Sequence, residues 1–233
     1  MLPSLPPAYE ATRNALHAVA EQVVAAAYWH ATTHIGLRPT PRGFGTPVFG
    51  NRERVRLDAT ALVHERAGAT RRHELTTLAA AAAFVGVPLG APTVYPAATH
   101  LAPEAPLAVD RDGALALADW YALSAALLGD LRAAHAELPS TETQIWPEHF
   151  DLGCEVGEEG TGSRANYGAS PGDESIAEPY LYVGPHEQAR RTGVFTRCKF
   201  GAAITYSELQ RAPEAGGAGR QFYESALADL VGE

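Results

Sequence analysis

Short segments with a strand-like pattern follow one another closely in this chain, with Gly- and Pro-containing turns between them. In the C-terminal half these segments are RANYG, EPYLYVG, GVFTR and KFGAAITY. Strands joined by short loops pair in the antiparallel sense, because a parallel neighbour requires a long crossover. The sequence therefore predicts an antiparallel sheet.

The N-terminal half shows the same order of patterns. A helical pattern begins near Pro7, and Leu16, Val19 and Val23 follow on one face of it. RERVRLDATALVHERAGATRRHEL is typical of two hairpins, and TTLAAAAAFVGVP is typical of a short helix that ends at Gly86. A long helix over 114–138, with Asp112 as its cap, opens the second half.

The stretch YWHATTHIGLRP contains two adjacent Thr and an Ile, which favour a strand over a helix. This predicted strand aligns with the alternating stretch TQIWPEHFDLGCEV later in the chain. The matches place Trp29 on Trp146, Ile35 on Leu152 and Gly36 on Gly153. They suggest that the two halves of the chain are related by duplication.

The predicted fold class is α+β, with an antiparallel sheet, helices packed on one side, and the order helix–strands–helix occurring twice. A chain of 233 residues fits a single domain over 1–233. The duplication suggests a finer division into halves 1–88 and 110–233. Residues 89–109, which are rich in Pro and show no period, would then be the linker.

Charge and composition exclude several classes of protein. The formal net charge is −9, and phosphate-backbone binding requires an excess of Lys and Arg, so no nucleic-acid partner is predicted. No apolar run reaches the roughly 18 residues that span a bilayer, and the N-terminus lacks the pattern of a leader. Cys154 and Cys198 form no C-x-x-C motif and suit a reducing compartment. We therefore expect a cytoplasmic protein without a membrane partner.

One candidate site lies in WPEHFDLG. On a strand, His149 and Asp151 would point to the same side, and the carboxylate could orient the imidazole as a general base. The alternative is a solvated polar face of a strand, with the histidine bonded to a nearby carbonyl. Trp146, Phe150 and Leu152 would lie on the opposite, buried face.

A second candidate is the loop GASPGDES with the two strand segments that flank it. It matches neither a hydrolase elbow nor a phosphate-binding loop, so Asp173 and Glu178 could simply cap turns in water. The flanking segments nevertheless carry an Arg suited to a carboxylate and several rigid amphipathic side chains. These residues are Arg164, Asn166, Tyr167, Tyr180 and Tyr182. Loops at strand ends with such groups are where pockets form.

Histidine spacing gives no metal prediction. His30 and His34 would lie about 13 Å apart on a strand, too far to share one ion. His64–Glu65 and His73–Glu74 fall opposite each other in a predicted hairpin, which is typical of a cross-strand polar pair. No metal and no cofactor are predicted.

Several sequence blocks resemble an uncharacterised actinobacterial protein family. They are QIWPEHFDLG, RANYGASPGDE, EPYLYVGP, FGA and QFYESAL, with IGLRPTPRGFGTP and LTTLAAAAAFVG in the N-terminal half. The resemblance covers nearly the whole chain and implies no activity, substrate or cofactor. It implies that Trp146–Asp151, Asn166–Glu174 and Pro179–Pro185 form the signature of the family.

Three functional hypotheses follow. The preferred one is a small-molecule-binding protein whose polar and aromatic pocket is formed by Trp146, Arg164, Asn166, Tyr167, Glu178, Tyr180 and Tyr182. The second is a hydrolase- or isomerase-type enzyme, with His149 as base, Asp151 as its orienting partner, and Asp173 or Glu178 as a second acid. The third is a homo-oligomer without a ligand, in which the polar strand face is the interface.

Overall fold

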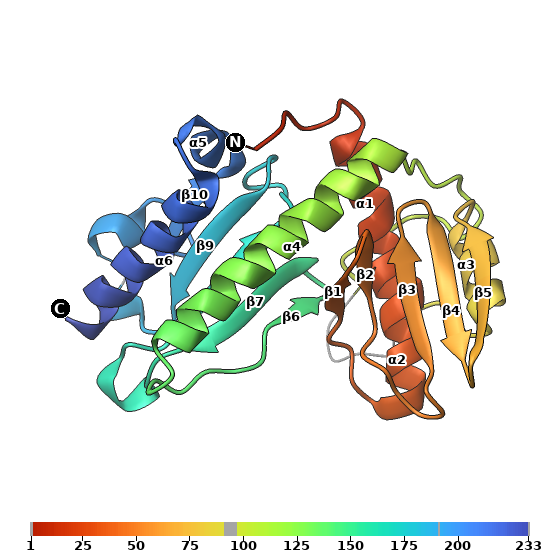
Figure 1. Cartoon of the computed structure of the whole chain (residues 1–233), viewed down its shortest axis with the longest axis horizontal. Helices are drawn as coiled ribbons and strands as arrows, with labels where there is room; N and C mark the ends of the chain where they lie inside the picture. The colour runs from red at the N-terminus through yellow and green to blue at the C-terminus, as the bar shows by residue number, and fades with distance from the viewer. Residues whose placement is uncertain (1, 91–96, 191, 233) are drawn as a thin grey trace. The chain divides into compact units, whose positions relative to one another are not determined.

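The computed structural model describes residues 2–90, 97–190 and 192–232 and is an α+β fold with two antiparallel sheets (Figure 1). The chain forms two compact units, each of which is described by itself. The N-terminal unit comprises Leu5–Ala122 and Ile145–Phe150. The C-terminal unit comprises Met1–Ser4, Leu123–Gln144 and Asp151–Glu233. The division falls inside one long helix.

The chain begins with a helix that is longer than the sequence predicts. It consists of α1 (Tyr9–Val19), the π-helical η1 (Ala20–Val24) and α2 (Ala25–Thr32). The predicted start near Pro7 and the buried face of Leu16, Val19 and Val23 are confirmed. The strand predicted for YWHATTHIGLRP is wrong over 28–32, which are helical, whereas Arg38 and Pro39 do lie in a strand. The Thr32 hydroxyl donates to the carbonyl of Tyr28 at 2.7 Å, which satisfies it within the helix.

Because Trp29 lies in a helix, the proposed alignment of Trp29 with Trp146 is also wrong. The order helix–strands–helix still occurs twice in the chain, as the sequence predicts. His30 lies in the last turn of α2, and Thr33 ends that helix in the left-handed conformation with φ 64°.

The first sheet is an antiparallel meander with the order β1-β2-β3-β4-β5. Its strands are β1 (Arg38–Thr40), β2 (Gly43–Gly45), β3 (Arg54–Asp58), β4 (Ala61–Arg66) and β5 (Ala69–Glu74). The two predicted hairpins are confirmed as β3–β4 and β4–β5. The short helix α3 (Leu78–Val85) follows, with Thr77 as its N-cap and Gly86 in the left-handed region at its end.

The predicted linker 89–109 belongs to the N-terminal unit, and its residues 91–96 lie outside the described part of the chain. The buried carboxylate of Glu21 in η1 accepts hydrogen bonds from the backbone N–H groups of Ala98 and Thr99, at 2.8 and 2.9 Å. Leu107 donates to the carbonyl of Thr76 at 2.8 Å. The described part of this segment is therefore tied to the helices of its own unit.

A turn separates β6 (Gln144–Trp146) from β7 (Asp151–Val156), where the sequence predicts one continuous strand. Phe150 adopts φ 56°, and its N–H donates to the carbonyl of Trp146 at 2.7 Å. The Phe150 ring packs on His17 and Phe44, with centroids 5.0 and 5.2 Å away. The Tyr121 hydroxyl donates to the Phe150 carbonyl at 2.6 Å. Burial of this ring therefore outweighs the local strand pattern.

The second sheet has the order β10-β9-β8-β7-β6, with β8 (Ala165–Ser170), β9 (Tyr180–Pro185) and β10 (Ala202–Thr205). The remaining elements are α4 (Arg111–Ala134), α5 (Tyr206–Arg211), α6 (Ala215–Val231) and the 3₁₀ turns η2 (Glu159–Thr161), η3 (Gln188–Arg190) and η4 (Gly193–Thr196). The predicted helix over 114–138 is α4, and Asp110, rather than Asp112, accepts the first-turn N–H of Gly113 at 3.0 Å.

One face of β7–β9 is covered by α6 and the second half of α4 (Figure 1). A Cβ added at Gly219 of α6 would lie 2.7 Å from Leu127 and 3.0 Å from Leu181, so α6 packs closely on both α4 and the sheet. The Tyr223 hydroxyl donates to the carbonyl of Gly168 at 2.8 Å. The side chains of this covered face are Leu152, Cys154, Val156, Ala165, Tyr167, Ala169, Leu181 and Val183, all buried.

On the opposite face, a tyrosine ring lies over two glycines. Gly153 of β7 pairs with Gly168 of β8, and Gly168 pairs with Tyr182 of β9. A Cβ at Gly168 would lie 2.4–2.6 Å from atoms of the Tyr182 ring, and one at Gly153 would lie 3.3 Å from its hydroxyl. Because the two glycines have no side chains, they leave the space that the Tyr182 ring occupies. Aromatic rings commonly cover glycines in sheets in this way.

Within the described residues, one helix is long and apolar enough to cross a membrane by length and composition, and that helix is α4. Half of its most apolar window is buried in the protein, and one such helix is weak evidence for a membrane span, because the core helix of a soluble protein can pass the same test.

We predict that Gly168→Ala lowers the free energy of unfolding by about 1–3 kcal/mol, because the new methyl group must displace the Tyr182 ring. Urea denaturation measures this change. The matched control is Gly129→Ala in α4, where a Cβ meets nothing within 4 Å and should stabilise the helix by about 0.5–1 kcal/mol. Equal effects of the two substitutions would show that the Tyr182 ring can keep its position without a glycine at 168.

His135 directly follows α4 and pairs with Glu224 of α6. Its Nε2 lies 2.7 Å from Glu224 Oε2. The hydrogen bond to Glu224 raises the pKa of His135 above its ordinary value of 6.5. A histidine whose pKa is raised by folding stabilises the folded protein at pH values below its ordinary pKa. This stabilisation is lost as the pH rises through the pKa of the folded state.

We therefore expect His135→Gln to destabilise the protein at acid pH, by under about 1 kcal/mol because the pair is partly exposed. The difference from the unsubstituted protein should disappear at alkaline pH. Urea denaturation at several pH values measures it, and a difference that grows with pH would contradict the assignment.

Candidate functional site

A cavity of about 430 Å³ lies at the end of β7 in the C-terminal unit. The chain leaves β7 at Gly157, forms η2 and returns to β8 at Arg164 and Ala165. The segment 139–141 runs beside it: Thr141 N–H donates to the carbonyl of Glu155 at 3.0 Å, and Gly157 N–H to that of Pro139 at 3.0 Å. The lining residues are Pro139, Ser140, Thr141, Glu155, Gly157, Glu158, Glu159, Gly160 and Arg164. We call this cavity the Glu155 pocket.

Glycine is required where the chain turns at the edge of the pocket. Gly157 has φ 103°, and a Cβ there would lie 2.5 Å from the carbonyl oxygen of Ser163. Gly162 has φ 71°, and a Cβ there would lie 2.6 Å from the carboxylate of Glu187. Both positions favour a residue without a side chain, so the glycines determine where the carboxylates of η2 project.

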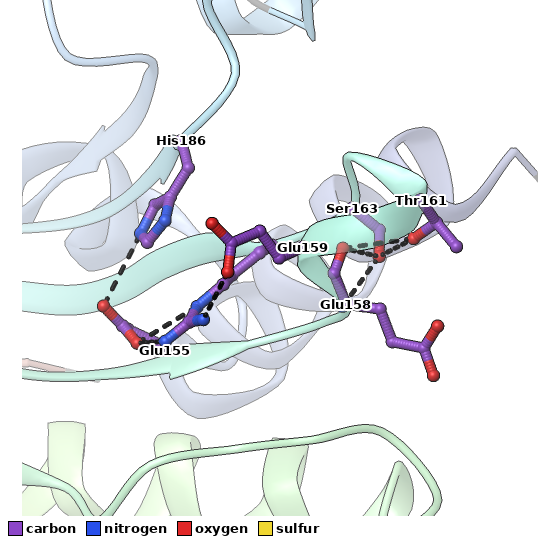
Figure 2. A network of polar contacts seen from close by, with 7 residues as sticks. Glu155, Glu158, Glu159, Thr161, Ser163 and His186 are labelled. Carbon is purple, nitrogen blue, oxygen red and sulfur yellow. Dashed lines mark hydrogen bonds and ion pairs between the residues drawn. The ribbon is translucent and has the colours of Figure 1, made fainter.

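An ion-pair network crosses the pocket (Figure 2). The Arg164 guanidinium donates through Nε and Nη2 to Oε2 of Glu155, the Nε contact being 3.2 Å long. Its Nη1 lies 3.4 Å from Oε2 of Glu159. His186 points toward Glu155, with 3.7 Å between Nε2 and Oε1. Bonding to Glu155 raises the pKa of Arg164, which therefore stays charged.

Hydroxyl groups order the backbone of η2. Ser163 Oγ accepts the N–H of Glu158 at 3.0 Å and lies 2.8 Å from Thr161 Oγ1. The Glu158 side chain extends away from these groups in Figure 2. Within the described residues its carboxylate has neither a hydrogen bond nor an ion pair. The Glu158 carboxylate is thus the acceptor at this pocket most available to a ligand, and Glu159, whose side chain is 85% exposed, has one long contact to Arg164.

Four of the residues predicted for a site come together elsewhere on the same face of the sheet. The Tyr182 hydroxyl donates to Asp151, and the Tyr180 hydroxyl donates to Asp173. The two tyrosine rings are 6.2 Å apart, and Phe200 stacks on Tyr180 at 5.7 Å. We call these four residues the Tyr–Asp cluster.

Both phenols of this cluster are held in the protonated form. Burial, followed by the neighbouring Asp151 carboxylate, raises the pKa of Tyr182 well above its usual range. Burial and the bond to Asp173 raise the pKa of Tyr180. At neutral pH the phenols therefore act as hydrogen-bond donors and cannot serve as bases.

Asp173 also organises its own loop. Its Oδ1 accepts the backbone N–H groups of Ser175 and Ile176, at 2.6 and 3.0 Å. Glu178 has a similar role, because its Oε2 accepts the N–H of Ser207 at 2.8 Å at the start of α5. Both carboxylates therefore accept hydrogen bonds from backbone N–H groups. This agrees with the alternative, given above, that Asp173 and Glu178 cap turns.

The other predicted residues lie apart from the Tyr–Asp cluster. Asn166 is exposed and lies opposite Glu155 on the neighbouring strand. Tyr167 lies on the covered face with no exposed surface. This burial raises the pKa of Tyr167. Arg164 lies in the Glu155 pocket.

Trp146 and His149 belong to the N-terminal unit. Trp146 is 39% exposed, whereas the sequence predicts it on a buried strand face. His149 lies in the turn before β7, and its N–H donates to the carbonyl of Trp146 at 3.2 Å. Since Phe150 is in the left-handed region, His149 and Asp151 do not share one face of a strand.

Sequence reasoning missed the carboxylates of the Glu155 pocket. The signal was the acidic, Gly-rich stretch EVGEEGTGSR between two strand segments, which brings Glu158 and Glu159 close to Arg164. It also missed His186, which follows β9: its N–H donates to the carbonyl of Arg164 at 3.1 Å, and its ring lies near Glu155.

Within residues 2–90, 97–190 and 192–232, no group of three His, Cys, Asp or Glu side chains has the arrangement of a metal site. No family model, curated protein or solved structure matches this chain. The resemblance to an actinobacterial family therefore stays a prediction.

We predict that Tyr182→Phe lowers the free energy of unfolding by about 1–3 kcal/mol, because Asp151 loses a donor to a charged group. Urea denaturation measures the loss. Tyr28→Phe is the matched control, since the Tyr28 hydroxyl has no hydrogen-bond partner among the described residues. Similar small effects of both substitutions would show that the Tyr182–Asp151 bond contributes nothing net.

Proposed function

We propose that the protein binds a small, polar, positively charged molecule, such as an amine, in the Glu155 pocket. The observation that supports this proposal is the charge of the lining. Three glutamates and one arginine give a formal charge of −3 + 1 = −2 in a cavity of about 430 Å³. A volume of this size is within the range of small-molecule sites.

The ion pairs of Arg164 determine which sign of charge a ligand of this pocket should carry. The sequence suggests that its planar guanidinium would bind the carboxylate of a ligand. In the structure Glu155 and Glu159 already occupy it. Arg164 therefore neutralises part of the lining and holds Glu155 in place. The side chains left for a ligand are acceptors, which favour a donor with positive charge.

Uncharged groups around the pocket suit a ligand that also forms hydrogen bonds. Ser140 Oγ accepts from Arg132 Nε at 3.2 Å, and Thr141 Oγ1 accepts the N–H of Glu155 at 2.9 Å. Both hydroxyls are held in position by these bonds, and each retains a lone pair that can accept a further hydrogen bond. A primary amine with several N–H donors fits such a lining.

Binding is favoured over catalysis by the state of the neighbouring groups. The predicted base and orienting pair, His149 and Asp151, depends on a continuous strand that the turn at Phe150 interrupts. The phenols of the Tyr–Asp cluster are protonated and already donate to carboxylates. The enzyme hypothesis thus lacks a supporting geometry within the described residues, and binding is the function we propose.

The test is a calorimetric titration with putrescine, a short diamine, and with butanediol, which has the same chain length without charge. We expect putrescine to bind with an affinity that falls as salt is added, and butanediol to bind much more weakly. Replacing Glu158 and Glu159 by Gln should lower the affinity by about two- to fivefold per carboxylate.

The matched control is Glu174→Gln, which removes one exposed carboxylate of the same unit outside the pocket. It should leave the affinity unchanged. Equal loss with Glu174→Gln would mean that only the net charge of the protein attracts the diamine. Equal binding of butanediol would mean that charge has no role. Either result would overturn the proposal.

A further inference from the structure

A second polar site lies on the first sheet, in the N-terminal unit. His64 on β4 is buried, with 3% of its surface exposed. Its Nδ1 lies 2.9 Å from Arg71 Nη2, and its Nε2 lies 2.8 Å from Glu53 Oε1. A guanidinium can only donate, so Nδ1 accepts and Nε2 carries the proton that is donated to Glu53. The geometry thus fits a neutral histidine between a glutamate and an arginine.

This arrangement fixes the position of the Arg71 guanidinium. Its Nη2 also donates to the carbonyl of Phe84 at 3.0 Å, and its central carbon lies 4.9 Å from the centroid of the Phe84 ring. Nε and Nη1 have no acceptor among residues 2–90, 97–190 and 192–232. A cation ordered on one side and open on the other is prepared to bind an anion at low entropic cost.

A cavity of about 330 Å³ adjoins this cation. It is lined by His64, Arg66, Ala67, Ala69, Arg71 and Val85. Arg66 contributes a second guanidinium, whose Nε lies 3.4 Å from Glu53 Oε2 and whose side chain is 66% exposed. The carboxylate of Glu53 lies 2.8 Å from His64 Nε2. The lining residues carry two guanidinium groups and no carboxylate, and Glu53, outside the lining, neutralises part of this charge through its contact with Arg66.

The stretch of sequence around this cavity is also positively charged. Residues 51–74 contain six Arg and four acidic residues, a formal charge of 6 − 4 = +2, in a chain whose net charge is −9. Screening limits the influence of distant charges to about 8–10 Å in physiological salt. An anion in this cavity thus experiences the local arginines more than the acidic chain as a whole.

We propose that this cavity binds the phosphate group of a small molecule. Arginine forms paired N–H···O bonds with phosphate, and two guanidiniums match a dianion better than a single negative charge. The volume leaves room for a further part of the ligand beside Val85 and the two alanines. This site is independent of the amine site proposed above, because its residues all lie in the other unit.

The test is a titration of the full chain with inorganic phosphate in low salt, followed by NMR of the backbone amides. We expect saturable shifts at residues 64, 66 and 71, with a dissociation constant on the order of millimolar because both guanidiniums are exposed. Arg71→Gln should weaken binding about tenfold, as expected when one charged hydrogen-bond donor is lost. Arg71→Lys should have an intermediate effect.

Arg72→Gln is the matched control. Arg72 is the next residue of β5, and its side chain points to the opposite face, where Nη1 lies 2.6 Å from Asp58 Oδ2. It should leave phosphate binding unchanged. Equal weakening by Arg72→Gln and Arg71→Gln, equally tight binding of acetate, or shifts that do not saturate would each overturn the proposal. If Arg71→Gln does not fold, exposed Arg66→Gln provides the same comparison.

Discussion

Alternation along β7, β8 and β9 is the constraint on which the rest of the C-terminal unit depends. Because successive side chains of a strand point to opposite faces, burial of Leu152, Cys154 and Val156 beneath the helices places Asp151, Gly153 and Glu155 on the other face. A shift of one residue in register would exchange the two sets. The Tyr–Asp cluster and the Glu155 pocket therefore share one face of the sheet, and the apolar residues of the other face determine where they lie.

Two glycines then decide which polar groups on that face meet. The Tyr182 ring crosses Gly168 and Gly153 because neither has a side chain, and its hydroxyl reaches Asp151 on the far strand. With a larger residue at Gly168, the ring would have to turn away and the carboxylate would lose this donor. The glycines in NYGAS and DLG are thus explained by packing, without any role in the conformation of a loop.

The sequence predicted the antiparallel hairpins and the Thr77 and Gly86 ends of α3, because these depend on turn residues and local periodicity. It failed where distant contacts outweigh local preference. Phe150 leaves the strand because its ring packs on His17 and Phe44, which lie far away in the sequence. For the site, Arg164 itself was predicted as a residue of a pocket. Its partners were not, because Glu159 pairs with it only after η2 folds back.

Net charge is a poor guide to what such a chain can bind. A value of −9 argues against the backbone of a nucleic acid, which needs many cations along one surface. It says little about one small ligand, because screening makes recognition depend on the charges within about 10 Å. Arg66 and Arg71 form a positive lining in the N-terminal unit, and three glutamates form a negative one in the C-terminal unit. Opposite linings in one acidic protein favour two ligands of opposite charge, and each can be tested without the other.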